Sequence, residues 1–212
     1  MRIAVFGATG LTGVEVVRRA LGRGHSVAAL CRNAPEPSVF GPGVDLIEGS
    51  PTDPGTVKRA VRGAEAVICV LGPRAPFTDV FCARATRVIV ESMKALGVRR
   101  LICQTGALVG DYRRNRTFFF EGMGNFFNRR RPAGALDRIE QEREVLNSGL
   151  EWTLVKPPRL TQGPARGSVQ ASEGLVVGML SSLSRADLAD FLLDLVASPA
   201  EGGKRIFVKS RA

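Results

Sequence analysis

The sequence predicts an α/β fold, namely a doubly wound and mostly parallel β-sheet with helices on both faces. Short apolar runs alternate with segments of helical periodicity along most of the chain, which is the pattern of parallel strands joined by helical crossovers. The composition agrees, because 44% hydrophobic and 24% charged residues are typical of a globular chain with a sizeable core. A length of 212 residues favours one domain covering residues 1–212.

The expected strands are short apolar runs bounded by turn or charged residues. They are Ile3–Phe6, Ser26–Cys31, Val44–Glu48, Ala66–Leu71, Arg100–Cys103, Trp152–Val155 and Ile206–Lys209. The expected helices have apolar residues at helical spacing and recognisable ends, such as a proline start, a serine cap or a glycine stop. They are Val14–Leu21, Pro54–Gly63, Thr78–Leu96, Ala135–Asn147 and Ser184–Val196. Residues 106–134 show neither pattern and are expected to form an irregular insertion.

Three glycines, Gly7, Gly10 and Gly13, follow the first expected strand and open the first expected helix. Gly7 allows a sharp turn, Gly10 leaves room for a diphosphate, and Gly13 lets the helix pack on the sheet. The helix N-terminus offers N–H groups and a partial positive charge, to which Thr9 and Thr12 add hydroxyls. This context predicts a Rossmann-like dinucleotide site at the strand ends, and a purely structural tight turn is the alternative.

The end of the second expected strand indicates which dinucleotide binds. Proteins of this type that bind NAD carry an acid there, about 20 residues after the glycines, to hold the ribose hydroxyls. Here the position holds Arg32, and no acid lies between Glu15 and Glu36. A guanidinium can pair with a 2′-phosphate, so the sequence predicts NADP(H) as the cofactor.

The charge, the cysteines and the hydropathy of the chain argue against nucleic-acid binding, a metal site and a membrane span. The net charge is +10, but the arginines are spread along the chain without a nucleic-acid motif, so no nucleic-acid partner is expected. Four scattered cysteines without a C-x-x-C pair are expected to be buried reduced thiols rather than metal ligands. No apolar run approaches the roughly 20 residues of a membrane span. The N-terminal run is too short for a signal peptide, which favours a cytoplasmic location.

Several stretches resemble the extended and atypical short-chain dehydrogenase/reductase proteins, in particular the NmrA-like and biliverdin reductase B (flavin reductase)-like members. Besides the Gly7–Gly13 turn, they are Val70–Arg74, Met93–Ile102, Glu142–Pro158 and Leu183–Asp190. Asp53 matches the second acid of the family's Gly-Asp-x-x-Asp, whereas Ser50 replaces the first. The resemblance implies cofactor contacts at Gly7, Thr9, Gly10, Leu11, Thr12, Gly13, Arg32, Asp53, Gly72, Arg74, Thr105 and Pro157.

The catalytic residues of the resembled family are only partly present. Its usual Tyr-x-x-x-Lys is absent, because the sole tyrosine, Tyr112, is followed four residues later by Arg116. Arg138 occupies the position where related proteins often carry a lysine, and an arginine cannot act as a general acid at neutral pH. The expected catalytic candidates are therefore Thr105, Lys156 and Arg138.

Other residues near these strand ends stay open as contributors. Gly106 replaces the serine that flavin-reductase-like members carry after Thr105, and Arg159, like Lys156, is expected to face the nicotinamide and to orient an anionic acceptor. The only histidine, His25, lies between a helix end and a strand and is expected to be structural or exposed.

The segment 111–134 interleaves arginines with phenylalanines. A long loop inside a compact domain is typically a lid or a binding segment. A mobile cover over the nicotinamide and a segment packed on the body or on a partner chain are equally compatible with it. Contact with a membrane surface or a nucleic acid is a further alternative.

Two functional hypotheses follow. The first is an NADPH-dependent oxidoreductase that transfers hydride to a flat conjugated acceptor such as a flavin, a quinone or a biliverdin-like molecule. Such acceptors can take their proton from water, so a missing proton donor does not exclude them. The second is a non-enzymatic NADP(H)-binding redox sensor of the NmrA-like type that acts through a protein partner.

Overall fold

The computed structural model describes residues 1–33, 39–73, 80–198 and 203–211. Its centre is an eight-stranded sheet in the order β3-β2-β1-β4-β5-β6-β10-β8, in which only the β10–β8 pair is antiparallel. The strands are β1 (Arg2–Phe6), β2 (Ser26–Cys31), β3 (Val44–Glu48), β4 (Ala66–Cys69), β5 (Arg100–Gln104), β6 (Glu151–Lys156), β8 (Val169–Ser172) and β10 (Lys204–Ser210). A separate parallel pair joins β7 (Arg159–Thr161) to β9 (Ser182–Ser184).

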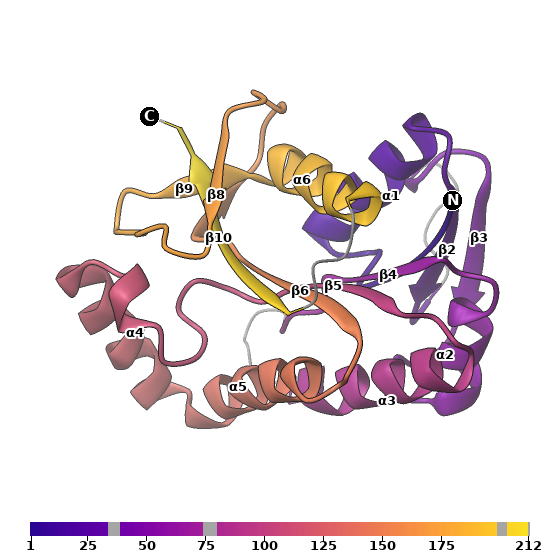
Figure 1. Cartoon of the computed structure of the whole chain (residues 1–212), viewed down its shortest axis with the longest axis horizontal. Coiled ribbons are helices and arrows are strands. Elements are labelled where there is room, and N and C mark those ends of the chain that lie inside the picture. Colours follow the sequence, from indigo (N-terminus) through magenta and orange to yellow (C-terminus); the bar gives the residue numbers. More distant parts are fainter. Residues whose placement is uncertain (34–38, 74–79, 199–202, 212) are drawn as a thin grey trace.

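Helices cover both faces of the sheet (Figure 1). On one face lie α1 (Leu11–Gly22) and α6 (Arg185–Ala197), and on the other lie α2 (Pro54–Val61), α3 (Cys82–Ala95) and α5 (Pro132–Leu146). Helix α4 (Phe118–Arg130) lies at one end of the molecule beside α5. This arrangement confirms the predicted single α/β domain with a doubly wound, mostly parallel sheet.

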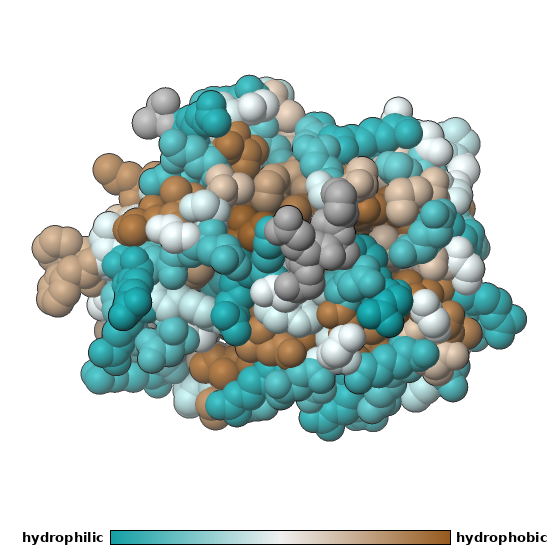
Figure 2. Space-filling model, viewed as in Figure 1, coloured by the Kyte–Doolittle hydropathy of each residue, from teal (hydrophilic) through white to brown (hydrophobic). Residues whose placement is uncertain are grey.

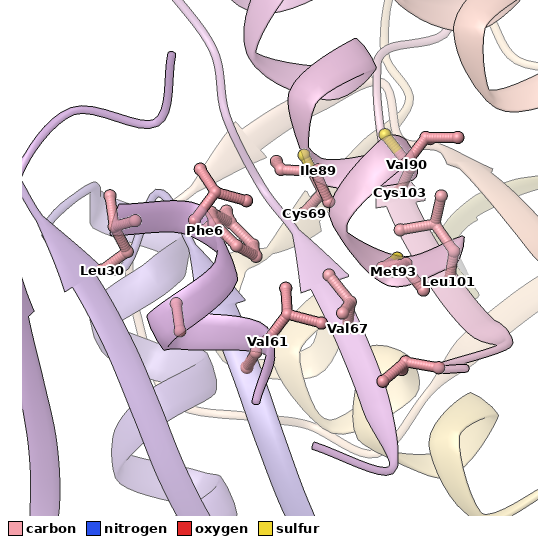
Figure 3. Close-up of a cluster of buried hydrophobic side chains, with 14 of the residues drawn as sticks. Phe6, Leu30, Val61, Val67, Cys69, Ile89, Val90, Met93, Leu101 and Cys103 are labelled. Carbon is pink, nitrogen blue, oxygen red and sulfur yellow. The ribbon is translucent and has the colours of Figure 1, made fainter. Parts of the chain in front are cut away.

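The core consists of two apolar layers, one on each face of the sheet. Side chains along a strand alternate between the faces, so Phe6 packs toward α2 and α3 while Val5 packs toward α1 and α6. Figure 3 shows the first layer, in which Phe6, Val67 and Leu101 of the strands meet side chains of the helices. Because both faces are covered, the inner strands are apolar throughout, which made them recognisable in the sequence.

All four cysteines, as predicted, are buried free thiols. Cys69 and Cys103 are register neighbours on β4 and β5, and Figure 3 shows both in the core. No group of metal-ligating side chains was found among the residues that the structure describes. In the same residues, no helix is long and apolar enough to cross a membrane.

The stretch 106–134 is more regular than the sequence predicts, because it contains α4 and the start of α5. Two glycines, Gly122 and Gly124, weaken the helical signal of α4, and tertiary contacts stabilise it instead. Its Phe120 is buried in a small cluster with Ala107, Val177 and Phe207. The helix expected from Thr78 begins at Cys82, and residues 74–79 lie outside the described part of the chain.

Candidate functional site

A pocket of about 640 Å³ lies at the C-terminal ends of β1, β2, β4 and β5. This is where ligands bind in open parallel sheets, beside the point at which the strand order reverses. Its lining residues come from the glycine turn and from the segments that follow these strands. They are Gly7, Thr9, Gly10, Leu11, Thr12, Leu30, Cys31, Arg32, Pro51, Val70, Leu71, Gly72, Pro73, Phe81, Gln104 and Arg185.

The glycine turn has the close packing that the sequence indicated. Gly7 has a φ of 86°, and a Cβ atom there would lie 2.8 Å from the carbonyl oxygen of Val70. A Cβ atom on Gly13 would lie 2.1 Å from the carbonyl oxygen of Gly7, so Gly13 packs against the turn. Gly10 is the N-cap of α1, and the first turn of this helix contains no acidic residue. The N–H groups at the start of α1 therefore face a pocket suited to an anionic diphosphate.

The end of the pocket beside β2 carries a cation. Arg32 follows β2, is exposed and lines the pocket beside Leu30 and Cys31. Asp53, in contrast, is absent from the lining. Its carboxylate accepts hydrogen bonds from the hydroxyl (2.6 Å) and the amide (2.7 Å) of Thr56 and caps α2. These hydrogen bonds hold the pKa of Asp53 below its usual value.

Arg138 lies behind the opposite end of the pocket. Its guanidinium donates to the carbonyl oxygens of Leu71 (2.7 Å) and Gln104 (3.5 Å) and to the side chain of Gln141. It thereby connects the segment that follows β4 with the end of β5. This places Arg138 as a positioning residue for the wall of the pocket. Gly72 lines the same wall, and Arg74 lies outside the described residues.

Thr105 and Lys156 belong to a buried polar network centred on Glu142. The Glu142 carboxylate accepts hydrogen bonds from the Thr105 hydroxyl (2.6 Å) and the Tyr112 hydroxyl (3.0 Å) and forms an ion pair with Lys156. The Lys156 ammonium also donates to the carbonyl oxygen of Val109 (3.0 Å). Since the Lys156 side chain is 0% exposed, it cannot touch a ligand in this conformation.

Burial changes the acid–base properties of this network. It lowers the pKa of Lys156 to about 8, although the Glu142 carboxylate acts in the opposite direction. It raises the pKa of Tyr112 to about 12, and the charge of Glu142 adds to this effect. The network fixes the segment between Thr105 and Tyr112, whose middle residues line a second pocket.

The second pocket, of about 180 Å³, is mostly apolar and lies between the segment 108–110 and the junction of α4 with α5. It shares Pro73 with the larger pocket, so the two meet beside the ends of β4 and β5. It is lined by Pro73, Leu108, Val109, Gly110, Phe127, Asn128, Arg131, Gly134, Ala135, Arg138 and Ile139.

The remaining candidates from the sequence lie away from both pockets. Pro157 is buried, and its carbonyl oxygen accepts a hydrogen bond from the amide of Ala107 (2.8 Å). Arg159 is exposed at the start of β7. His25 lies between α1 and β2, at the N-terminal ends of the parallel strands and therefore away from the pockets at their C-terminal ends. It is only partly buried.

Two charged residues were not among the predicted site residues, one that lines the large pocket and one that caps a helix. Arg185, the first residue of α6, lines the large pocket opposite the glycine turn. Asp137 of α5 caps α3 from a neighbouring helix by accepting from the amides of Cys82 (2.9 Å) and Ala83 (3.0 Å). Arg185 lies within the family-like stretch Leu183–Asp190, but no spacing there marked it as a pocket residue, and Asp137 acts across a tertiary contact.

The fold and the glycine-lined pocket define a dinucleotide-binding protein of the Rossmann type. The chain belongs to the NAD(P)H-binding family, whose model matches residues 7–199. This finding confirms the NAD(P)-binding family that the sequence resemblance indicated.

Among curated proteins, the chain is similar to the (4-alkanoyl-5-oxo-2,5-dihydrofuran-3-yl)methyl phosphate reductase of Streptomyces griseus. The two are 31% identical over 156 residues, which is 73% of this chain and 46% of that protein. The match thus spans less than half the length of the Streptomyces enzyme.

Solved structures share the fold over nearly the whole chain. ChuY of Escherichia coli O157:H7, described as an anaerobillin reductase, superposes with a TM-score of 0.83 at 21% identity and covers 99% of this chain and 97% of its own. A short-chain dehydrogenase/reductase of Veillonella parvula in complex with NADP superposes with a TM-score of 0.82 at 19% identity, covering 100% of this chain and 95% of its own.

Proposed function

We propose that this protein is an NADPH-dependent oxidoreductase that transfers hydride to a flat conjugated acceptor such as a flavin, a quinone or a biliverdin-like molecule. The observation that carries the proposal is the junction of the two pockets at Pro73. With the adenosine at Arg32 and the diphosphate at the N-terminus of α1, an extended cofactor directs its nicotinamide toward this junction. An acceptor in the small pocket would then lie beside the nicotinamide.

The charge of the large pocket favours NADPH over NADH. Arg32 and Arg185 line the large pocket, and no carboxylate is found among its described lining residues. A guanidinium pairs well with a phosphate, whereas binding of the unmodified ribose of NAD usually relies on an acid. These observations support a site for the 2′-phosphate of NADP(H) at Arg32.

The small pocket favours a flat acceptor that carries an anionic substituent. Its walls are mostly apolar and include Phe127, which suits a flat ring, while Arg131 and Arg138 suit an anionic substituent. No Tyr, Lys, His, Asp or Glu side chain is found among the described residues that line either pocket. This favours acceptors that receive hydride on a conjugated ring and a proton from water.

The names of two similar proteins are compatible with such chemistry. The Streptomyces griseus protein is called a reductase, and ChuY is described as an anaerobillin reductase. Because the first match covers less than half of that enzyme and the second is 21% identical, they support reductase chemistry for this chain without specifying its acceptor.

The test is NADPH oxidation in the presence of FMN, menadione or biliverdin, with the wild-type protein and a Phe127→Ala variant. We expect turnover with at least one acceptor. In the variant, the KM for that acceptor should rise severalfold while the Kd for NADPH stays constant. Phe119→Ala, on the same helix but outside the pocket, is the matched control and should leave both constants unchanged.

A second candidate function, the non-enzymatic redox sensor, is favoured by one observation. Thr105, Lys156 and Arg138 are all engaged in internal hydrogen bonds, and Lys156 is fully buried. The same assay separates the two functions. Tight binding of both NADP⁺ and NADPH without turnover of any acceptor would contradict the reductase and support the sensor.

A further inference from the structure

Helix α4 exposes large aromatic side chains to solvent. Phe118 is 86% exposed, Phe119 78% and Phe126 54%, whereas Phe120 on the opposite side is buried. At 3.6 residues per turn, the three exposed phenylalanines lie on one side of the helix. The helix therefore lacks the usual amphipathic pattern, because large apolar side chains lie on its outward side as well as on its buried side.

The loop between β8 and β9 extends this surface. The Thr117 amide donates to the carbonyl oxygen of Val177 (3.0 Å), which holds the loop against the start of α4. Two residues of the same loop, Met179 (50%) and Leu180 (95%), are also exposed. In Figure 2, apolar side chains project from the end of the molecule where Figure 1 places α4 and this loop.

The outward surface of α4 is also cationic. By helical spacing, Arg129 and Arg130 lie on the same side as the exposed phenylalanines, and the Arg130 guanidinium lies 4.8 Å from the centre of the Phe126 ring. The segment 111–131 contains six arginines against two acids. One of these acids, Glu121, is paired with the buried Arg116 at 2.8 Å. An exposed helix face with phenylalanine and arginine but no carboxylate complements an apolar surface that carries negative charge.

We propose that α4, together with Met179 and Leu180, docks this protein on an anionic lipid bilayer surface. Exposed aromatic side chains insert at the boundary between head groups and acyl chains, and arginines attract anionic head groups. A helix of 13 residues is about 20 Å long, so it lies on the bilayer rather than across it. A second copy of the chain is the weaker fit, because a symmetric interface would place the arginines of both copies against each other.

Docking at α4 has a structural consequence that does not depend on the proposed function. Phe127 and Asn128 of the same helix line the small pocket. A docked protein therefore brings that pocket close to the lipid surface, where apolar molecules dissolved in the bilayer are concentrated.

The test is flotation of the full chain with vesicles of phosphatidylcholine and phosphatidylglycerol, and with vesicles of phosphatidylcholine alone. We expect binding to the anionic vesicles only, weakening as salt is added. Phe118→Ser/Phe119→Ser should reduce binding at least about tenfold, because burial of two aromatic rings is lost. Arg129→Gln/Arg130→Gln should reduce it roughly 25-fold. The matched control is Lys58→Gln/Lys94→Gln, which removes the same charge from α2 and α3 and should change binding about twofold or less.

Three outcomes would overturn the docking surface. The first is binding of the Phe118→Ser/Phe119→Ser variant as strong as that of the wild type, and the second is absence of the wild-type protein from anionic vesicles. The third is a concentration-dependent dimer in analytical ultracentrifugation that this variant abolishes, which would assign the surface to a second copy. Since both phenylalanines are exposed, the variant should melt at the wild-type temperature, and this measurement shows that it remains folded.

Discussion

Arg32 is the residue on which the proposed preference for NADPH depends. It follows β2 and lines the end of the pocket where we propose that the adenosine binds. In Arg32→Glu, the new carboxylate would repel the 2′-phosphate of NADPH, but it could accept hydrogen bonds from the ribose hydroxyls of NADH. We expect the Kd for NADPH to rise roughly 10- to 100-fold and the Kd for NADH to stay constant or fall.

Titration calorimetry with each nucleotide measures both constants for Arg32→Glu. Arg62→Glu on the surface after α2 causes the same change in net charge away from the pocket, so it is the matched control. An equal loss of affinity for both nucleotides, or no loss, would refute the assignment of Arg32 to the phosphate.

The burial of Lys156 should make the free energy of unfolding depend on pH. Its ordinary pKa of 10.5 is lowered by burial to about 8 in the folded chain. Below pH 8 both the folded and the unfolded chain hold this proton, and the full cost of burying the ammonium is present. Between pH 8 and 10.5 the unfolded chain binds more protons, so the free energy of unfolding rises with pH. The gain attributable to Lys156 should reach at most roughly 3 kcal/mol.

Denaturant unfolding of the wild type and of Lys156→Met between pH 7.5 and about 10 isolates this contribution. The wild type should gain stability relative to the variant as the pH increases. The range stops at about pH 10 because Tyr112, with its pKa raised to about 12, contributes the opposite slope above its ordinary value of 10.0. A constant difference would show that Lys156 keeps its ordinary pKa in the fold, and a decreasing difference would show that its pKa is raised there.

At the scale of elements, α4 contains two glycines in opposite environments. A Cβ atom on Gly122 would meet nothing within 4 Å, whereas one on Gly124 would lie 2.8 Å from the Leu108 side chain. Gly122→Ala should therefore raise the free energy of unfolding by about 0.5–1 kcal/mol through helix propensity. Gly124→Ala must displace Leu108, so it should be less stable than Gly122→Ala by at least about 1 kcal/mol.

Because Leu108 lines the small pocket, the Gly124→Ala variant should also alter the KM for an acceptor, and Gly122→Ala should not. Chemical denaturation and steady-state kinetics of both variants provide the comparison. If both alanine variants were equally stable and equally active, α4 would not pack on Leu108 as the structure describes.

The same glycines explain why sequence patterns predicted some elements better than others. The inner strands β1, β2, β4 and β5 are recognisable because burial on both faces makes them continuously apolar. Helix α4 was expected to be irregular, since two glycines and an exposed aromatic side remove the usual amphipathic pattern. Its stability comes from contacts with residues distant in the sequence, such as Phe120 with Val177 and Phe207.

In the candidate site, too, local motifs were recognisable in the sequence and tertiary contacts were not. The sequence indicated Gly7, Gly10 and Arg32, because a dinucleotide turn and the next strand end form a local motif. It did not indicate the network around Glu142, because Thr105 is 37 residues away in the chain and Tyr112 is 30. The spacing of a motif therefore pointed to residues that line one end of the large pocket, whereas the network around Glu142 depends on tertiary packing that no spacing encodes.

At the scale of the whole molecule, the large pocket connects distant parts of the chain, from Gly7 in the first turn to Arg185 in the last helix. A cofactor bound across it would lie against the start of α1, the start of α6 and, at Phe81, the N-cap of α3, so we expect binding to stabilise the domain as one cooperative unit. At about 100 times its Kd, NADPH should add about 2.7 kcal/mol to the free energy of unfolding and raise the Tm by roughly 5–10 °C.

Differential scanning calorimetry with NADPH and with NADH at equal concentrations measures this effect. The shift should be larger for NADPH, and in Arg32→Glu the shift caused by the same concentration of NADPH should fall to about half or less. A single transition that moves as a whole is expected, since α1 and α6 pack together and α6 carries Arg185. If NADPH split the transition into two, the segments around β1 and α6 would unfold independently, and the pocket would not join them in solution.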